Sequence, residues 1–414
     1  MAWLIETRTV SARLAASLLF SIVATIGALL YFDHMGRPPS KPDAGLIQSL
    51  EMFRGSRRPA ASVVIVHLGH GGNAAARSAP VRRAVLAELV RCASRKGAKA
   101  VTILGCLEGP SPYGHSDDLA LVDACRTAGN VVVEARRPIP GMKPHVGQWT
   151  CEPFAPIHAV AAGVGDLAIL SEGGTGWTIR VYGITGSPPW WGLCVETVRV
   201  GMRLSRGDVR ASKDCLMLGA RSVALADAEL IVNFRGPRGA IPTLNATELL
   251  GGSPKLDLLK GAYVIVVGDR EHEHSLGVPF GAKRGELDGE MGVDEILGNG
   301  IETLAGGIAI KWLKLPATLS ITFGECLVFA LVILFSRWII VALPTLYGLL
   351  FLKDRIEAFF FSKCIAMDTA YAATALLPCI CLSLVMRLIL FLYFIDPESG
   401  EHVEDSHAKG GRGT

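Results

Sequence analysis

The residues best suited to bind a charged ligand lie in one short stretch, LIVNFRGPRG, residues 230–239. Arg235 and Arg238 come after an apolar segment that predicts an inner strand, and Gly236-Pro237 predicts a sharp turn. A guanidinium placed there can bind a carboxylate or a phosphate through two hydrogen bonds. The alternative is a structural corner, whose arginines bind loose carbonyls or face solvent. We favour the corner and keep both arginines as candidate ligand-binding residues.

A third candidate, Asp269, follows the predicted strand in VVGD. Its turn can line a crevice at the carboxyl ends of parallel strands, although a plain chain reversal explains it as well. HLGH (His67 and His70) and EHEH (271–274) also offer metal-binding atoms. Neither motif has a third ligand at a diagnostic spacing, so we predict no metal site.

Other kinds of chemistry find little support in the sequence. There is no Ser-His-Asp grouping, no G-x-S-x-G motif and no paired carboxylates, so we predict neither an enzyme nor a cofactor. GVG at 163–165 runs into a predicted strand instead of a helix, which excludes a dinucleotide fingerprint. The net charge of +3, without a dense basic stripe, argues against nucleic acid as a partner.

The start of the chain predicts a membrane anchor. Half of the 414 residues are hydrophobic (50%) and 19% are charged, which is more apolar than an average soluble domain. Segment 14–32 is uncharged and long enough to span a bilayer, and no small-x-small cleavage site follows it. Because Arg8 and Arg13 precede it, the positive-inside rule leaves the N-terminus in the cytoplasm.

The end of the chain predicts three more spans. As one helix, the apolar segment 317–352 would be about 54 Å long, against a hydrocarbon core of about 30 Å. We therefore predict two spans that turn at Ser336-Arg337 and, after a polar and aromatic loop, a third. The predicted domains are a cytoplasmic N-terminus (1–13), the anchor (14–32), a linker (33–60), an extracytoplasmic domain (61–315), spans at 316–336 and 337–352, a loop (353–368), a span at 369–395 and a polar tail (396–414).

One observation resists this topology. It leaves Lys353, Arg355 and Lys363 outside the cytoplasm and the acidic tail inside, against the charge rule. A topology with two C-terminal spans satisfies the rule better and remains the alternative.

The large polar domain alternates strand and helix patterns. ASVVIVHL, AKAVTIL and NVVVEA predict buried strands, separated by an amphipathic helix that Gly97 closes and by a helix that Ser116 caps. This order predicts a mostly parallel α/β sheet with helices on both faces. Further along, SEGGTG predicts a turn between two antiparallel strands, and PPWWGLCVETVRVGM a helix with its prolines in the first turn. LIVNFRG, a helix near Asn245, AYVIVVG and a helix at 292–306 complete the domain.

Six cysteines fall in this domain: Cys92, Cys106, Cys125, Cys151, Cys194 and Cys215. In an oxidising compartment they can form disulfides, and the sequence leaves the pairing open. The alternative is that several are small buried apolar residues.

The order of these elements resembles the type-two CHASE domain, an extracellular sensory domain. The resemblance runs from VVIVHL through GVGDLAILSEGGTGWTIRVYG, NFRGP and GVDEILGNGIETLAGG to the C-terminal spans, covering roughly 61–395. It implies an acidic residue at the end of the first strand, another at the end of the second, and a histidine near the start of the final helix. This sequence has His67, then Leu104 or Gly105, and Ile296-Leu297 at those places. Relatives also continue into a cytoplasmic output domain, whereas this sequence stops after its spans.

Two charges lie within the predicted spans. Glu325 and Arg387 are costly there, and by residue counting they are offset along the membrane normal by roughly 6 Å, which two long side chains can bridge. We predict that they pair, with snorkelling of Arg387 to the inner surface as the alternative.

Together these features predict a bacterial inner-membrane receptor subunit. Its extracytoplasmic domain would detect an unidentified ligand and relay the signal through helix 292–306 and the spans to a separate membrane or cytoplasmic signalling protein, or to a homo-oligomer. The alternative is a non-signalling membrane scaffold whose outer domain binds a protein partner.

Overall fold

A computed structural model describes residues 2–34, 50–51, 54–68, 81–137, 151–167, 169–172, 175–182, 190–226, 228–268, 275–278, 289–336, 339–366 and 369–395, and the following statements concern these residues. The chain divides into two compact units. The helical unit comprises Met1–Asp43, Leu313–Phe359 and Met367–Thr414, and the α/β unit comprises Ala44–Trp312 with Phe360–Ala366.

A six-stranded parallel sheet forms the centre of the α/β unit. Its strand order is β11-β1-β12-β2-β3-β4, and every neighbouring pair is parallel. The strands are β1 (Val63–His67), β2 (Ala100–Leu104), β3 (Val131–Ala135), β4 (Gly163–Asp166), β11 (Thr243–Asn245) and β12 (Tyr263–Val267). The predicted mostly parallel sheet is confirmed.

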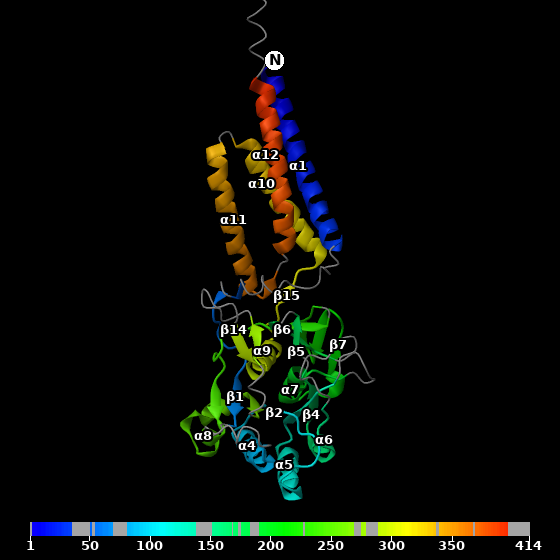
Figure 1. Ribbon diagram of the computed structural model, residues 1–414, viewed down its shortest axis with the longest axis vertical. Helices are drawn as coiled ribbons and strands as arrows, with labels where there is room; N and C mark the ends of the chain where they lie inside the picture. The colour runs from blue at the N-terminus through cyan, green and yellow to red at the C-terminus, as the bar shows by residue number, and fades with distance from the viewer. Residues whose placement is uncertain are drawn as a thin grey trace, which may run out of the picture. The chain divides into compact units, whose positions relative to one another are not determined.

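Helices cover both faces of this sheet, as predicted (Figure 1). One face packs against α4 (Arg83–Arg95), α5 (His115–Ala128), α6 (Ala155–Val160) and α8 (Ala246–Leu250), and the other against α7 (Leu193–Gly201) and α9 (Val293–Gly306). In β1, Val63 and Ile65 join the core on the α7–α9 side, while Val64 and Val66 join the opposite core. Because both faces are buried, the strand is a continuous apolar run.

Two helix starts differ from the prediction. α5 begins at His115 after the cap residue Gly114, so Ser116 lies inside the first turn and is not the cap. α7 begins at Leu193, later than its prolines suggested, with Gly192 at the cap position. A Cβ on Gly192 would lie 2.6 Å from the carbonyl oxygen of Arg180, so close backbone approach fixes where this helix can start.

Two smaller sheets complete the α/β unit. β5 (Ile169–Glu172) and β6 (Thr175–Arg180) form the predicted antiparallel pair, joined by β10 (Glu229–Ile231), β13 (Ser275–Val278) and β14 (Gly289–Gly292). β7 (Val209–Ala211), β8 (Cys215–Leu218) and β9 (Arg221–Ala224) form an antiparallel meander. Among the described strands β10 lies at the edge of its sheet, paired with β6, so the prediction that Arg235 and Arg238 follow an inner strand is wrong.

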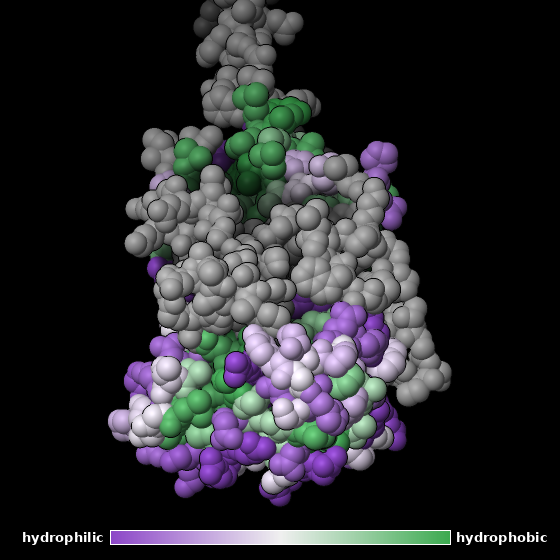
Figure 2. All heavy atoms as spheres, turned by 60° about the horizontal axis from the view of Figure 1, so that its bottom comes forward, coloured by the Kyte–Doolittle hydropathy of each residue, from purple (hydrophilic) through white to green (hydrophobic). Residues whose placement is uncertain are grey.

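The exposed surface of the α/β unit mixes hydrophilic and hydrophobic residues at the end shown in Figure 2. Large apolar side chains exposed in this unit include Val85, Tyr113, Leu119, Leu250 and Leu258. Scattered exposed apolar residues of this kind are normal for a protein surface in water.

The helical unit contains three helices long and apolar enough to cross a membrane: Val10–His34 within α1 (Ala2–His34), α10 (Leu315–Phe335), and Tyr371–Leu390 within α12 (Thr369–Ile395). Ala24, Ala28, Cys326, Ala375 and Cys379 are among the small residues buried where these three helices pack together. These three helices support the predicted membrane protein, and the predicted span at 337–352 is not among them.

α11 (Ile339–Ser362) runs well beyond the predicted end of its span at residue 352, so most of the expected loop 353–368 is helical. α10 ends at Phe335 and α11 begins at Ile339, on either side of the turn predicted for Ser336-Arg337. α10 and α12 run in the same direction, since Cys379 Sγ donates to Cys326 O at 3.4 Å and Arg387 Nη1 to Ile333 O at 2.9 Å. α11 must therefore run antiparallel to both.

The segment between α11 and α12 returns to the α/β unit. There β16 (Ile365–Ala366) pairs in parallel with β15 (Lys311–Trp312), the residues just before α10. α10 and α12 therefore leave from adjacent, parallel strands.

Candidate functional site

The carboxyl edge of the main sheet brings together a group of charged side chains. β1 ends at His67, whose Nε2 lies 2.9 Å from Asp294 Oδ2 in the first turn of α9. The next residue, Glu295, accepts a hydrogen bond of 2.6 Å from the backbone N–H of Gly239, and Arg238 lies near its carboxylate. We call His67, Arg238, Asp294 and Glu295 the edge cluster.

Burial raises the pKa of the Glu295 carboxyl, and the neighbouring charge of Asp294 raises it further. The hydrogen bond from Gly239 and the positive charges of Arg238 and His67 oppose this increase. Two adjacent acids beside a histidine thus lie at the carboxyl ends of parallel strands, the edge at which open α/β sheets bind ligands.

The resemblance expected from the sequence implies an acid at the end of the first strand and a histidine near the start of the final helix. Here His67 ends β1 and Asp294 lies in the first turn of α9, and the two side chains are in contact. The position expected from the sequence was Ile296-Leu297, whereas the residue in contact with His67 is Asp294.

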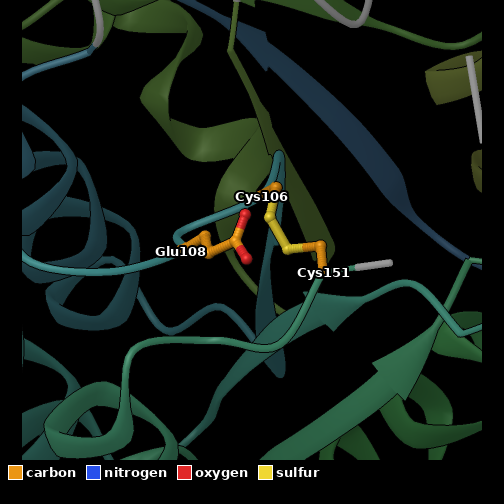
Figure 3. A group of neighbouring side chains, drawn as sticks. All are labelled: Cys106, Glu108 and Cys151. Carbon is orange, nitrogen blue, oxygen red and sulfur yellow. A yellow bond between two sulfur atoms is a disulfide. The ribbon is translucent and has the colours of Figure 1, made fainter. Parts of the chain in front are cut away.

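A disulfide lies at the ends of the neighbouring strands. Cys106, two residues after β2, is bonded to Cys151, and Figure 3 shows the carboxylate of Glu108 beside the sulfur atoms. Ligand atoms of these three residues lie within 4.8 Å of one another. Bonded to each other, the sulfurs are not thiolates, and a thiolate is the form of cysteine that binds a metal. The arrangement is therefore a crosslink at the carboxyl edge.

Charges at β3 and β4 hold this part of the edge together. Glu134 accepts a hydrogen bond of 2.7 Å from Gly105 N and pairs with Arg136. Burial raises the pKa of Asp166, at the end of β4, to about 6. The bidentate pair of Arg137 with Glu152, at 2.6 and 2.8 Å, lies next to it.

The turn at 233–239 is fixed by side chains that come from elsewhere in the sequence. From α9, Asn299 Oδ1 accepts from Arg235 N at 2.8 Å and Thr303 Oγ1 accepts from Asn233 N at 3.1 Å. From the segment before β1, Arg57 Nη2 donates to Asn233 O at 2.7 Å. The backbone of Arg235 is thus part of a structural corner, as we favoured, while Arg238 belongs to the edge cluster.

The side chain of Asn233 lies at the centre of a buried polar network. Its Oδ1 accepts from Arg54, and its Nδ2 donates to Ile308 O at 2.7 Å and contacts Cys364 Sγ at 3.3 Å. Arg54 also donates to Glu51 Oε2 at 2.8 Å, and Arg57 donates to Glu302 Oε1 at 2.5 Å. We call Glu51, Arg54, Arg57, Asn233 and Glu302 the polar hub.

The polar hub is almost fully buried: Glu51 and Glu302 are 0% exposed and Asn233 is 1% exposed. Burial raises the pKa of Glu51 to about 8, although Arg54 and the N–H of Phe234 lower it. Each carboxyl group of the hub has a guanidinium beside it, Glu51 with Arg54 and Glu302 with Arg57, as buried ionisable groups require.

The polar hub joins three separated parts of the chain. Residues 50–57 follow α1, Ile308 precedes α10, and Cys364 lies between α11 and α12. All three meet at Asn233 within the α/β unit. Each part continues in sequence into a helix of the helical unit. α9 carries Asp294 and Glu295 of the edge cluster at its start and Glu302 of the polar hub two turns later, about 10 Å along its axis.

The charges predicted within the membrane have different neighbours from those expected. Arg387 binds the carbonyl of Ile333, eight residues beyond Glu325 on α10, which places it about 12 Å from the level of Glu325 instead of the expected 6 Å. Lys353 and Glu357 of α11 are the charged neighbours of Glu325. Counting from span ends failed because the ends of α10 and α12 are not level with each other.

Some predicted site residues lie outside the described part of the chain, namely Asp269, His70 and residues 271–274. Sequence reasoning missed Asn233, Glu51 and Asp294. A polar residue beside apolar ones was the one signal for Asn233 and Asp294, but their partners Arg54 and His67 are more than a hundred residues away in the sequence.

Comparisons with protein-family models, with curated proteins and with solved structures give no match for this chain.

Proposed function

We propose that this protein is a receptor subunit of the bacterial inner membrane, with a sensory α/β unit outside the cytoplasm that is related to the type-two CHASE domain. The edge cluster is where a signal is received. The polar hub passes it to the membrane helices, and a separate protein reads it inside the cell. The observation that carries the proposal is Asn233, whose single side chain contacts three segments that continue in sequence into membrane helices.

The physical basis of the relay is α9. Its first turn carries Asp294 and Glu295 of the edge cluster, and its later turns carry Asn299, Glu302 and Thr303. A shift or rotation of this helix therefore changes the contacts of the edge cluster and of the polar hub at once. A ligand acts by binding one position of the helix better than the other. A helix inside a close-packed core moves between discrete positions, which suits a switch.

Two features support the proposed topology. The pairing of β15 with β16 gives α10 and α12 a common side of departure, so the chain must return through α11, which at 24 residues is about 36 Å long. This favours three C-terminal crossings over two, despite Lys353 and Arg355. The Cys106–Cys151 disulfide fits an oxidising compartment and therefore an extracytoplasmic α/β unit.

The proposal is tested by crosslinking the full-length protein in its native membranes and purifying it through a C-terminal tag. We expect a cytoplasmic kinase, cyclase or other signalling enzyme in stoichiometric amount. The Asn233→Ala variant lacks the central hydrogen bonds of the polar hub. The same partner should still be purified with it, but the variant should no longer change the partner's activity in response to a stimulus. Recovery of extracytoplasmic proteins alone would instead support the scaffold alternative.

A further inference from the structure

The middle of the helical unit contains a carboxylate in an unusual position. Glu325 lies ten residues from Leu315 and ten from Phe335, the ends of α10, or about 15 Å from each end. In a bilayer with a hydrocarbon core of about 30 Å, this is the midplane. Its Oε2 atom is buried and has no hydrogen-bond partner among the residues that the structure describes.

The charges around Glu325 come from α11. Lys353 and Glu357 are its charged neighbours, and they form an ion pair with each other one helical turn apart. The Lys353 side chain is 15% exposed and that of Glu357 is 11% exposed, so both lie largely inside the unit. The negative charge of Asp354, three residues before Glu357, repels that of Glu357. The guanidinium of Arg355 lies 4.8 Å from the centre of the Phe351 ring.

The charge count of this cluster does not balance. Two carboxylates, Glu325 and Glu357, share one ammonium group, Lys353, which leaves a net charge of −1 if all three are ionised. An uncompensated charge inside the hydrocarbon core is costly, and intramembrane acids therefore acquire a counter-charge or a proton. The polar hub offers a contrast in the same chain, because there each buried carboxylate has its own arginine.

We propose that Glu325, Lys353 and Glu357 form an intramembrane proton-binding site that holds one proton per chain, carried on Glu325. With the proton bound, the remaining Lys353–Glu357 pair is neutral. When the proton leaves, Glu325 and Glu357 compete for Lys353, which pulls α10 and α11 into a different contact. The helical unit is thereby a sensor of proton availability. This inference needs α10 and α11 to lie in the membrane, and it does not depend on the receptor proposal.

A proton fits this cluster better than a metal cation. A cation of the sodium or calcium type needs several oxygen ligands around it, whereas here the ammonium group of Lys353 already pairs with Glu357. A proton needs one carboxylate oxygen, which Glu325 Oε2 provides.

The test uses the full-length protein in lipid nanodiscs and dicyclohexylcarbodiimide, an apolar reagent that modifies protonated carboxyl groups in membranes. Peptide mass spectrometry locates the label. We expect label on Glu325 near pH 7 and progressively less label as the pH is raised. Glu302, buried but paired with Arg57, is the internal control and should stay unlabelled.

Two variants test the charge count itself. Glu357→Gln removes the competing acid, so Glu325 can pair with Lys353 as ions, and the label on Glu325 near pH 7 should fall about tenfold. Lys353→Met leaves two acids without a cation, so both Glu325 and Glu357 should be labelled. Size-exclusion profiles identical to wild type confirm that both variants are folded.

Three outcomes would overturn the proposal. One is the absence of label on Glu325 across this pH range. The second is equal labelling in Glu357→Gln and wild type, which would show that the balance of charges in the cluster does not decide whether Glu325 is protonated. The third is protection of Glu325 by sodium or lithium ions at constant pH, which would make the cluster a cation site.

Discussion

Replacing Asn233 by alanine tests the polar hub most simply. The change removes the acceptor for Arg54 and the donor for Ile308 O. A hydrogen bond to a charged group contributes about 1.5–3 kcal/mol and a neutral one about 1 kcal/mol, and here both partners would be left buried. The contact with Cys364 Sγ adds little. We therefore expect Asn233→Ala to lower the free energy of unfolding of the α/β unit by about 3–4 kcal/mol.

The assay is urea unfolding of the full-length protein in detergent, followed by tryptophan fluorescence. Asn130→Ala is the matched control, because Asn130 donates one neutral hydrogen bond, to Ala98 O at 2.9 Å, and should lose about 1 kcal/mol. Equal losses in the two variants would refute the view that Asn233 joins several segments of the chain.

Three further changes have defined outcomes. The pKa of Glu51 is raised from 4.5 to about 8, so the folded state retains a proton that the unfolded state releases. The contribution of Glu51 to stability should therefore be greatest below about pH 4.5 and fall as the pH rises to 8. Glu51→Gln should remove this decline in a pH series of melting curves. Cys106→Ser removes a disulfide between residues 45 apart in the sequence and should lower the free energy of unfolding in urea by about 2–4 kcal/mol. A loss no larger than that of a surface substitution would argue against the disulfide. Gly165→Ala should strongly lower the melting temperature, because the new Cβ would lie 2.5 Å from the Cα of Leu193. Gly207→Ala is the control and should be close to neutral, because the nearest atom to its Cβ lies at 3.8 Å. The reverse order would contradict the packing of α7 on β4.

The main sheet could be predicted because its strands are buried on both faces and are therefore continuous apolar runs. VVIVH and YVIVV carry that signal in themselves, and the helices between them have clear apolar stripes. The short strand Val209–Ala211 carries almost none, because three residues cannot show a period, and the apolar run that predicted a strand at Glu229–Ile231 did not reveal its place at the edge of a sheet. Their pairing is decided by tertiary packing.

The candidate site was less predictable because its contacts, like the pairing of the short strands, are decided by tertiary packing. The arginines of the turn at 233–239 attracted attention by their charge, yet the residue that matters most there is the uncharged Asn233. Its role depends on Arg54, Ile308 and Cys364, which are distant in sequence. Residue types predict which atoms can interact, and only the fold determines which of them meet.

The central claim is that α9 couples the edge cluster to the polar hub, and hydrogen exchange of the full-length protein in nanodiscs tests it most directly. Asp294→Asn perturbs the start of α9, and Asp117→Asn perturbs the opposite face of the sheet, where Asp117 accepts from Arg83 N and Ala84 N. The account predicts faster exchange at 308–312 and 361–366 in Asp294→Asn and unchanged exchange there in Asp117→Asn. If the effect of Asp294→Asn stops at the end of β1 and the first turn of α9, the two places are not coupled and the account is wrong.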